Sequence, residues 1–83
     1  MAIMIHPHAW ERMQERGLTE AEVRTTISNG EKFTAKFGRT GFRHNFSFKS
    51  YRDGKFFRIK QVEIYGADEE RDFIVITVVV KYF

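Results

Sequence analysis

Three side chains that suit phosphate chemistry lie four residues apart near the start of the chain: His8, Arg12 and Arg16. Residues four apart fall on nearly the same line of a helix, so the three form a stripe. Histidine carries protons near neutral pH, and arginine binds phosphate oxygens through two N–H groups at once. Helical spacing sets the stripe at the border of the face that carries Ala9 and Met13, which we expect to be buried. The pattern therefore indicates a helix whose edge can hold a phosphate group.

Cleavage of RNA without a metal ion needs a base for the 2′-hydroxyl proton, cations for the charge on phosphorus, and an acid for the leaving oxygen. We expect His8 or His44 to serve as the acid or base, and Arg12 and Arg16 to bind the phosphate. A further set of basic and aromatic residues would hold the nucleic-acid backbone: Arg43, Lys49, Arg58, Lys60 and Tyr82.

Each candidate has a structural alternative. His8 could be an ordinary first-turn residue that packs beside Trp10. His44 shares its strand face with phenylalanines and could be a buried histidine with satisfied hydrogen bonds. Arg12 and Arg16 could lie across the sheet and pair with glutamates.

Positive charge is concentrated in the middle of the chain. The formal net charge is +3, from 14 Lys and Arg against 11 Asp and Glu. Within residues 32–60 the only acidic side chain is Asp53, whereas the segments on either side are net acidic. Phenylalanine and tyrosine are interleaved with the basic residues. The distribution favours nucleic acid or an acidic protein as a partner; the alternative is a solvated sheet face whose edges are protected by Lys and Arg.

Length and composition exclude several classes of protein. The 83 residues suffice for one domain, which we expect to span residues 1–83. The hydrophobic content of 42% excludes a disordered chain, and the absence of cysteine excludes disulfides and thiol chemistry. We expect no metal site and no cofactor, because the histidines and the acidic residues lack ligand spacing. We also expect a cytoplasmic protein outside the membrane, because the apolar run 73–80 is too short to span a bilayer.

Two short helices are expected to position the His/Arg stripe. Pro7 can begin the first helix, and Gly17 can end it in a left-handed conformation. Thr19 and Glu22 have the spacing of a capping box, which predicts a second helix over residues 20–28. Asn29 and Gly30 would end that helix.

From residue 31 the hydrophobic period changes to two, which predicts strands. The expected strands cover residues 31–37, 42–52, 56–65 and 73–82, with hairpin turns at 38–41, 53–54 and 66–71. A switch of apolar parity predicts a bulge near Lys60 and Gln61. The fold class is therefore α+β, with an N-terminal helical hairpin packed on a four-stranded antiparallel sheet. Residues 2–5 could add a short strand beside the last one; otherwise the last strand is an exposed edge and predicts a homodimer.

The first helix and its continuation read His8-Ala9-x-x-Arg12-Met13-x-x-Arg16-Gly17-Leu18-Thr19. This resembles the opening of a family of small bacterial proteins classed as a domain of unknown function. The segment Ile76-Thr77-Val78-Val79 resembles the last strand of that family. The order of elements is also similar to that of the RelE/ParE toxin superfamily.

The resemblance implies a toxin of a toxin–antitoxin pair. RelE-type toxins are metal-independent endoribonucleases that cut mRNA, on the ribosome or free, whereas ParE-type toxins act on gyrase. An acidic antitoxin encoded next to the toxin would be the protein partner. The functional basic or aromatic residues that such toxins carry near the C-terminus would here be Lys81, Tyr82 and Phe83. The alternative is a non-catalytic module that binds nucleic acid or inhibits a protein.

Overall fold

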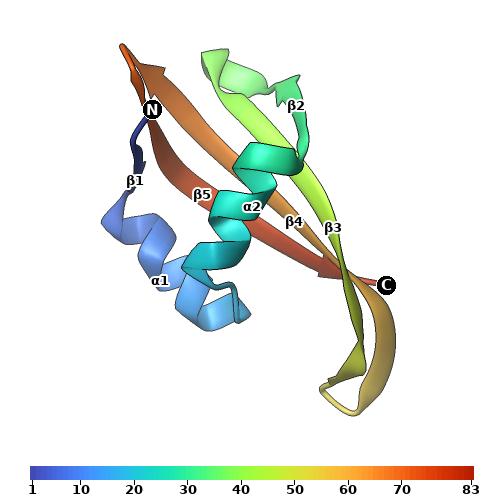
Figure 1. Cartoon of the computed structure of the whole chain (residues 1–83). Helices are drawn as coiled ribbons and strands as arrows, with labels where there is room; N and C mark the ends of the chain where they lie inside the picture. The colour runs from blue at the N-terminus through green and yellow to red at the C-terminus, as the bar shows by residue number, and fades with distance from the viewer.

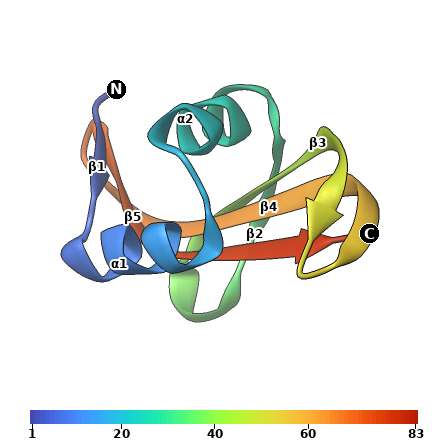
Figure 2. The same cartoon turned by 90° about the horizontal axis from the view of Figure 1, so that it is seen from below.

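A computed structural model describes all residues from Met1 to Phe83. The elements follow the order β1 (Ile3–Ile5), α1 (Pro7–Arg16), α2 (Glu20–Asn29), β2 (Glu31–Thr34), η1 (Lys36–Gly38), β3 (Thr40–Arg52), β4 (Lys55–Glu69) and β5 (Asp72–Tyr82). The strands form one sheet in the order β1-β5-β4-β3-β2 (Figure 1). Helix α1 packs against β5, and α2 packs over β3 and β4. The short η1 turn projects from the side of the sheet opposite α2 (Figure 2).

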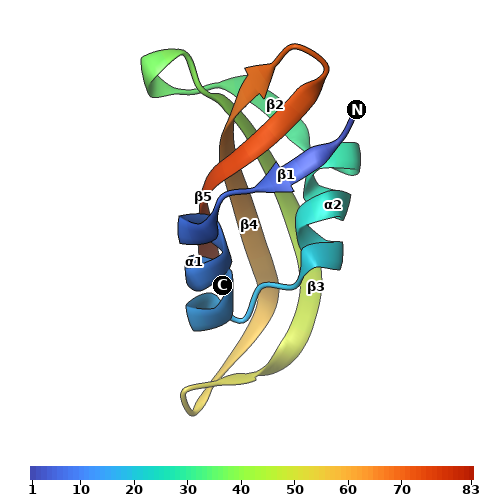
Figure 3. The same cartoon turned by 90° about the vertical axis from the view of Figure 1, so that its left-hand side faces the viewer.

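The α+β class and the helical hairpin are confirmed, but the sheet differs from the prediction. It has five strands and is mixed, because β1 runs parallel to β5 with Ile3 opposite Phe73 and Ile5 opposite Val75 (Figure 3). The purely antiparallel sheet was therefore wrong, and the optional N-terminal strand is present. The physical reason lies in β5, whose side chains are apolar on both faces and whose backbone needs a neighbour on both edges.

The helix boundaries follow the capping signals in the sequence. Gly17 adopts φ 66° and ends α1, as predicted. The backbone N–H of Thr19 donates to Glu22 Oε1 at 3.0 Å, and the backbone N–H of Glu22 donates to Thr19 Oγ1 at 3.1 Å. This reciprocal capping box starts α2, which runs to Asn29, one residue beyond the predicted end.

The strands differ from the prediction at two of their turns. Strand β2 ends at Thr34 instead of residue 37, because Phe37 adopts a left-handed φ of 61° that no strand accommodates. Strand β4 extends to Glu69, and β5 begins at Asp72. The predicted acidic turn is therefore shortened to the two residues between them.

The predicted bulge near Lys60 and Gln61 was also misplaced. Both residues pair in regular register, with Tyr82 and Lys81 respectively. The register shifts lie on either side of these residues: between Ser47 and Ser50 of β3, opposite Phe57 to Ile59, and between Tyr65 and Gly66 of β4. Near the first of them, the N–H groups of Arg58 and Ile59 both donate to the Phe83 carbonyl, at 2.7 and 3.2 Å. Two successive donors on one acceptor are typical of a β-bulge.

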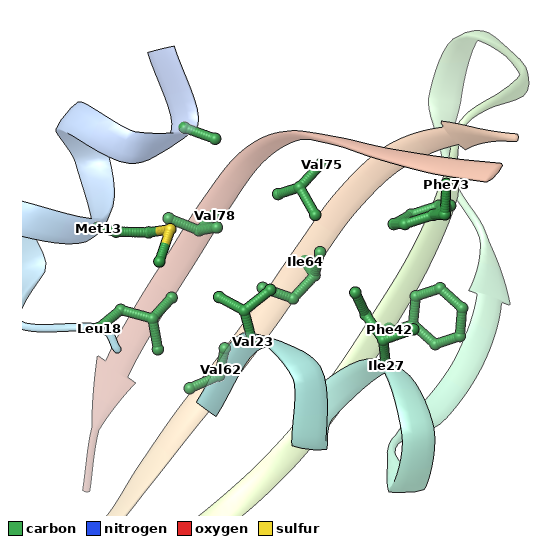
Figure 4. Packing of buried hydrophobic residues seen from close by; sticks show 11 residues of the cluster. Met13, Leu18, Val23, Ile27, Phe42, Val62, Ile64, Phe73, Val75 and Val78 are labelled. Atoms are coloured by element: carbon green, nitrogen blue, oxygen red, sulfur yellow. The ribbon is translucent and has the colours of Figure 1, made fainter. Parts of the chain in front are cut away.

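One hydrophobic core joins the two helices to the sheet (Figure 4). Met13 of α1 and Val23 of α2 are fully buried, and Phe73 meets Phe42 edge to face with ring centroids 5.3 Å apart. The core residues are Ala9, Met13, Leu18, Val23, Ile27, Phe42, Val62, Ile64, Phe73, Val75 and Val78. The β3–β4 hairpin continues beyond this core as a protruding arm (Figure 1). None of the helices has the length and apolar character that crossing a bilayer requires.

Candidate functional site

A pocket of about 220 Å³ lies where α1 meets β5 and is lined by His8, Arg12, Ile76 and Thr77. His8 and Arg12 are one helical turn apart on α1, as the spacing predicted. The side chain of His8 is largely exposed, and that of Arg12 is about half exposed. The pocket therefore brings an imidazole, a guanidinium and a hydroxyl together at a position that solvent and ligands can reach.

A bulge in β5 puts two neighbouring side chains into this pocket. Tyr65 pairs with Thr77, but the next residue, Gly66, pairs with Val75, so Ile76 is an extra residue in β5. Two residues of the bulged strand then oppose one of its partner, which re-aims the side chains locally. Ile76 and Thr77 consequently both line the pocket.

The ion pairs of His8 and Arg12 leave both groups available. His8 Nδ1 lies 3.7 Å from Glu11 Oε2, and Arg12 Nη1 lies 3.9 Å from Glu15 Oε2. Exposed pairs at such distances contribute at most about 1 kcal/mol. A phosphate that bridges the imidazole and the guanidinium would displace these two carboxylate contacts at little cost.

Arg16 and His44 do not join His8 and Arg12. The Arg16 guanidinium donates a hydrogen bond to the Val78 carbonyl and so holds α1 to the outer edge of β5. His44 lies on β3, two strands away from β5, and its ring meets the Phe46 ring edge to face at 4.7 Å. The four predicted catalytic residues thus divide into one accessible pair and two separate positions.

The residues expected to hold nucleic acid divide in the same way. Lys60 is only 6% exposed, and its Nζ donates to the Gly17 carbonyl at 2.7 Å and to Glu22 Oε1 at 2.9 Å. This ammonium ties the linker between the helices to the sheet and is not free to bind a phosphate. Lys49 and Arg58, in contrast, are exposed and form no ion pair.

Arg43 is held by a carboxylate that sequence reasoning did not single out. Glu63 is 5% exposed, and Arg43 reaches it at 2.7 and 2.9 Å while Lys81 Nζ lies 3.6 Å away. The hydrogen bond to Glu63 raises the pKa of Arg43. The register of β3 and β4 places these two side chains opposite each other, and no local pattern reveals that register.

Tyr82 lies at the base of the protruding arm. Its ring contacts the rings of Phe48 and Phe57, with centroids 5.0 and 5.7 Å apart, and the Arg52 guanidinium lies 4.9 Å above it. The arm itself carries an exposed pair of rings, Tyr51 and Phe56, 5.4 Å apart. Basic and aromatic side chains therefore alternate along this part of the surface.

A second pocket adjoins the first and was also missed. It has a volume of about 510 Å³, and its lining includes Phe33, Phe37 and Tyr65 together with the same Ile76 and Thr77. Burial and the nearby Glu63 carboxylate raise the pKa of Tyr65, so its hydroxyl stays protonated at neutral pH. Elsewhere, no group of three or more His, Asp or Glu side chains gathers as a metal site would require.

Comparison with known protein families identifies one match. Residues 5–80 match a family described as "Domain of unknown function (DUF4258)", and the chain belongs to this family. Comparison with curated proteins finds no match. Comparison with solved structures finds none either.

Proposed function

We propose that this DUF4258 domain is an endoribonuclease that cleaves single-stranded RNA without a metal ion, with His8 and Arg12 as its catalytic residues. The observation that carries the proposal is the convergence of His8 and Arg12 with Thr77 in one pocket. These residues come from the two segments on which the resemblance to a domain-of-unknown-function family rests, one at each end of the chain.

The pocket supplies the base and the phosphate-binding groups that the transesterification of RNA requires, and solvent supplies the acid. The neutral His8 imidazole takes the proton of the 2′-hydroxyl, whose oxygen attacks phosphorus as the bond from phosphorus to the 5′ oxygen breaks. Arg12 donates two N–H groups to the phosphorane, and the Thr77 hydroxyl can donate a third hydrogen bond. Water protonates the leaving 5′ oxygen. The products are a 2′,3′-cyclic phosphate and a 5′-hydroxyl.

The protruding arm is suited to hold the rest of the strand. Tyr51 and Phe56 present exposed rings on which bases can stack. Four basic side chains of this region have no ion pair: Lys49, Arg52, Lys55 and Arg58. We assign the backbone contacts to these residues and omit Lys60, whose charge is already paired.

The family resemblance supports a biological role as the toxin of a toxin–antitoxin pair that acts on cytoplasmic mRNA. The partner would be an acidic antitoxin that covers the basic surface. If so, induced expression of the chain arrests bacterial growth and creates new 5′ ends in total RNA. Arrest without new RNA ends would instead indicate a protein target.

Substitutions in the pocket are expected to remove cleavage while the fold persists. His8→Ala and Arg12→Ala should each slow cleavage of a single-stranded RNA oligonucleotide by about 100-fold or more, because each removes a group that acts in the transition state. The assay contains a chelator, and mass spectrometry identifies the cyclic phosphate. Arg24→Ala is the matched control, because Arg24 is exposed on α2 and pairs only with Glu20.

The second candidate function is non-catalytic binding of nucleic acid, which the basic arm favours by itself. RNA affinity that falls steeply with salt, without any cleavage by the wild-type protein, would support this candidate and overturn the endoribonuclease. Unfolding of both pocket variants would show that the two side chains are structural.

A further inference from the structure

The larger pocket has the lining of a site for a flat ligand. Its volume of about 510 Å³ lies within the range of small-molecule sites. The rings of Phe33 and Tyr65 stand nearly perpendicular, at 80°, with centroids 5.8 Å apart. A flat heterocycle can stack on one such ring while its edge meets the other.

Phe37 is exposed in a way that packing does not explain. The residue is 93% exposed, and its backbone adopts φ 61°, a region that bulky residues seldom occupy. Strained backbone of this kind persists where the surroundings impose it, and it often marks a binding site. The ring lines the pocket and belongs to no part of the core.

The charges around this pocket favour an anionic ligand. Lys36 and Arg39 both line it, and the lining contains no acidic side chain. Neither cation forms an ion pair. A flat, uncharged group that is attached to phosphates fits this combination of rings and cations.

The two pockets share a wall. Ile76 and Thr77 line both of them, so the two pockets lie next to each other. The His8–Arg12 pocket is the proposed phosphate site. The larger pocket is therefore the space beside the scissile phosphate.

We infer that the larger pocket is a nucleobase subsite, which holds a base of the RNA strand next to the phosphate at His8 and Arg12. This inference rests on the proposed function for the identity of the phosphate. The base stacks against Phe37 and Tyr65. Lys36 and Arg39 bind the neighbouring phosphate. The subsite gives the enzyme a base preference.

The test is binding of nucleoside 3′-monophosphates, measured by NMR with inorganic phosphate as the comparison ligand. Inorganic phosphate should shift side-chain signals of the basic residues His8, Arg12, Lys36 and Arg39 and leave the ring signals of Phe37 and Tyr65 unchanged. One or more of the four nucleotides should also shift Phe37 and Tyr65 and bind more tightly than phosphate. Nucleotides that bind no more tightly than inorganic phosphate would overturn the subsite.

Phe37→Asn removes the ring and keeps a residue that tolerates positive φ. It should weaken binding of the preferred nucleotide by about 10-fold, as loss of a stacking partner does, and leave phosphate binding unchanged. Trp10→Ala is the matched control, because it removes a partly exposed ring that lines neither pocket. Equal effects of the two substitutions would contradict the subsite.

The two proposals fail separately in this design. A wild-type protein that binds nucleotides through Phe37 but does not cut RNA would overturn the endoribonuclease and support the subsite. A protein that cuts RNA, with unchanged base preference and nucleotide affinity in Phe37→Asn, would overturn the subsite and support the endoribonuclease.

Discussion

Gly66→Ala is expected to destabilise the protein by about 3 kcal/mol or more. This loss exceeds the usual cost of overpacking a core, because the added methyl group meets backbone as well as a side chain. A Cβ at this position would lie far inside van der Waals contact with the Ile74 carbonyl oxygen and 2.5 Å from Phe73 Cζ. The carbonyl is part of β5 just before the Ile76 bulge, so it cannot turn away without distorting that bulge. Chemical denaturation of the purified variant measures the loss, and failure to obtain soluble protein agrees with it.

Gly41→Ala is the matched comparison for Gly66→Ala. The three atoms nearest to a Cβ at Gly41 all belong to the ring of Phe33, a half-buried side chain that can shift. We expect a loss below about 1 kcal/mol. Adding Phe73→Leu to Gly66→Ala should not restore stability, because the Ile74 carbonyl remains in place. Restoration by Phe73→Leu would show that the ring, and not the backbone, causes the effect.

Glu22→Ala is expected to destabilise the protein by about 2–3 kcal/mol. This loss is somewhat smaller than the loss on breaking a fully buried ion pair, because the Glu22 side chain retains some exposure. The substitution removes half of the capping box and leaves the Lys60 ammonium buried with only the Gly17 carbonyl as a partner. Glu20→Ala breaks an exposed pair with Arg24 in the same helix and should cost less than about 0.5 kcal/mol. Thermal and urea unfolding of both variants measure the difference.

Replacing the buried cation separates its two contributions. Lys60→Met keeps the length of the side chain and removes the charge, and such replacements of buried ionic groups are often neutral. In the Lys60→Met background, Glu22→Ala should therefore cost only the lost helix cap, about 1 kcal/mol. An unchanged cost of Glu22→Ala in both backgrounds would show that the ion pair has no energetic coupling.

The same pair predicts how stability changes in acid. Burial alone would raise the pKa of Glu22, but the backbone N–H of Thr19 and the Lys60 ammonium outweigh it and hold the pKa below its ordinary 4.5. The folded state thus binds this proton less readily than the unfolded state. The contribution of the ionised Glu22 side chain to the free energy of unfolding is complete above pH 4.5. It is lost as the pH falls through the lowered pKa. The melting temperature of Glu22→Gln should accordingly fall less steeply in acid than that of the wild type.

Local signals predicted the helices well because their causes are local. Thr19 and Glu22 are three residues apart and bond to each other, so their types and spacing contain the whole capping box. Phe37 shows the opposite case. Its apolar character continues the pattern of β2, but the following Gly38 permits a left-handed turn that ends the strand early. Turn geometry at such positions depends on the strands that the turn joins.

The candidate site was predicted only in part, because it depends on the register of the strands and on which side chains the helices and their linker cover. The spacing of His8 and Arg12 identified one wall of the pocket. The opposite wall depends on the extra residue Ile76 in β5, and an insertion of one residue into a pairing leaves no mark on a single sequence. Lys60 likewise belongs to a basic segment, but the helix linker that covers it decides its role. His44 and His8 are alike as residue types, and only the strand order separates them.

The place of β5 at the end of the chain also determines when the His8–Arg12 pocket can form during synthesis. The ribosome makes His8 and Arg12 early, but Ile76 and Thr77 emerge almost seventy residues later. Until then α1 lacks the strand on which it packs, and β4 lacks its neighbour at the centre of the sheet. A nascent chain that still holds its last strand in the exit tunnel therefore contains no complete pocket. Under the proposed function, the chain therefore cannot cut the message from which it is being translated until its own coding region has been read almost to the end.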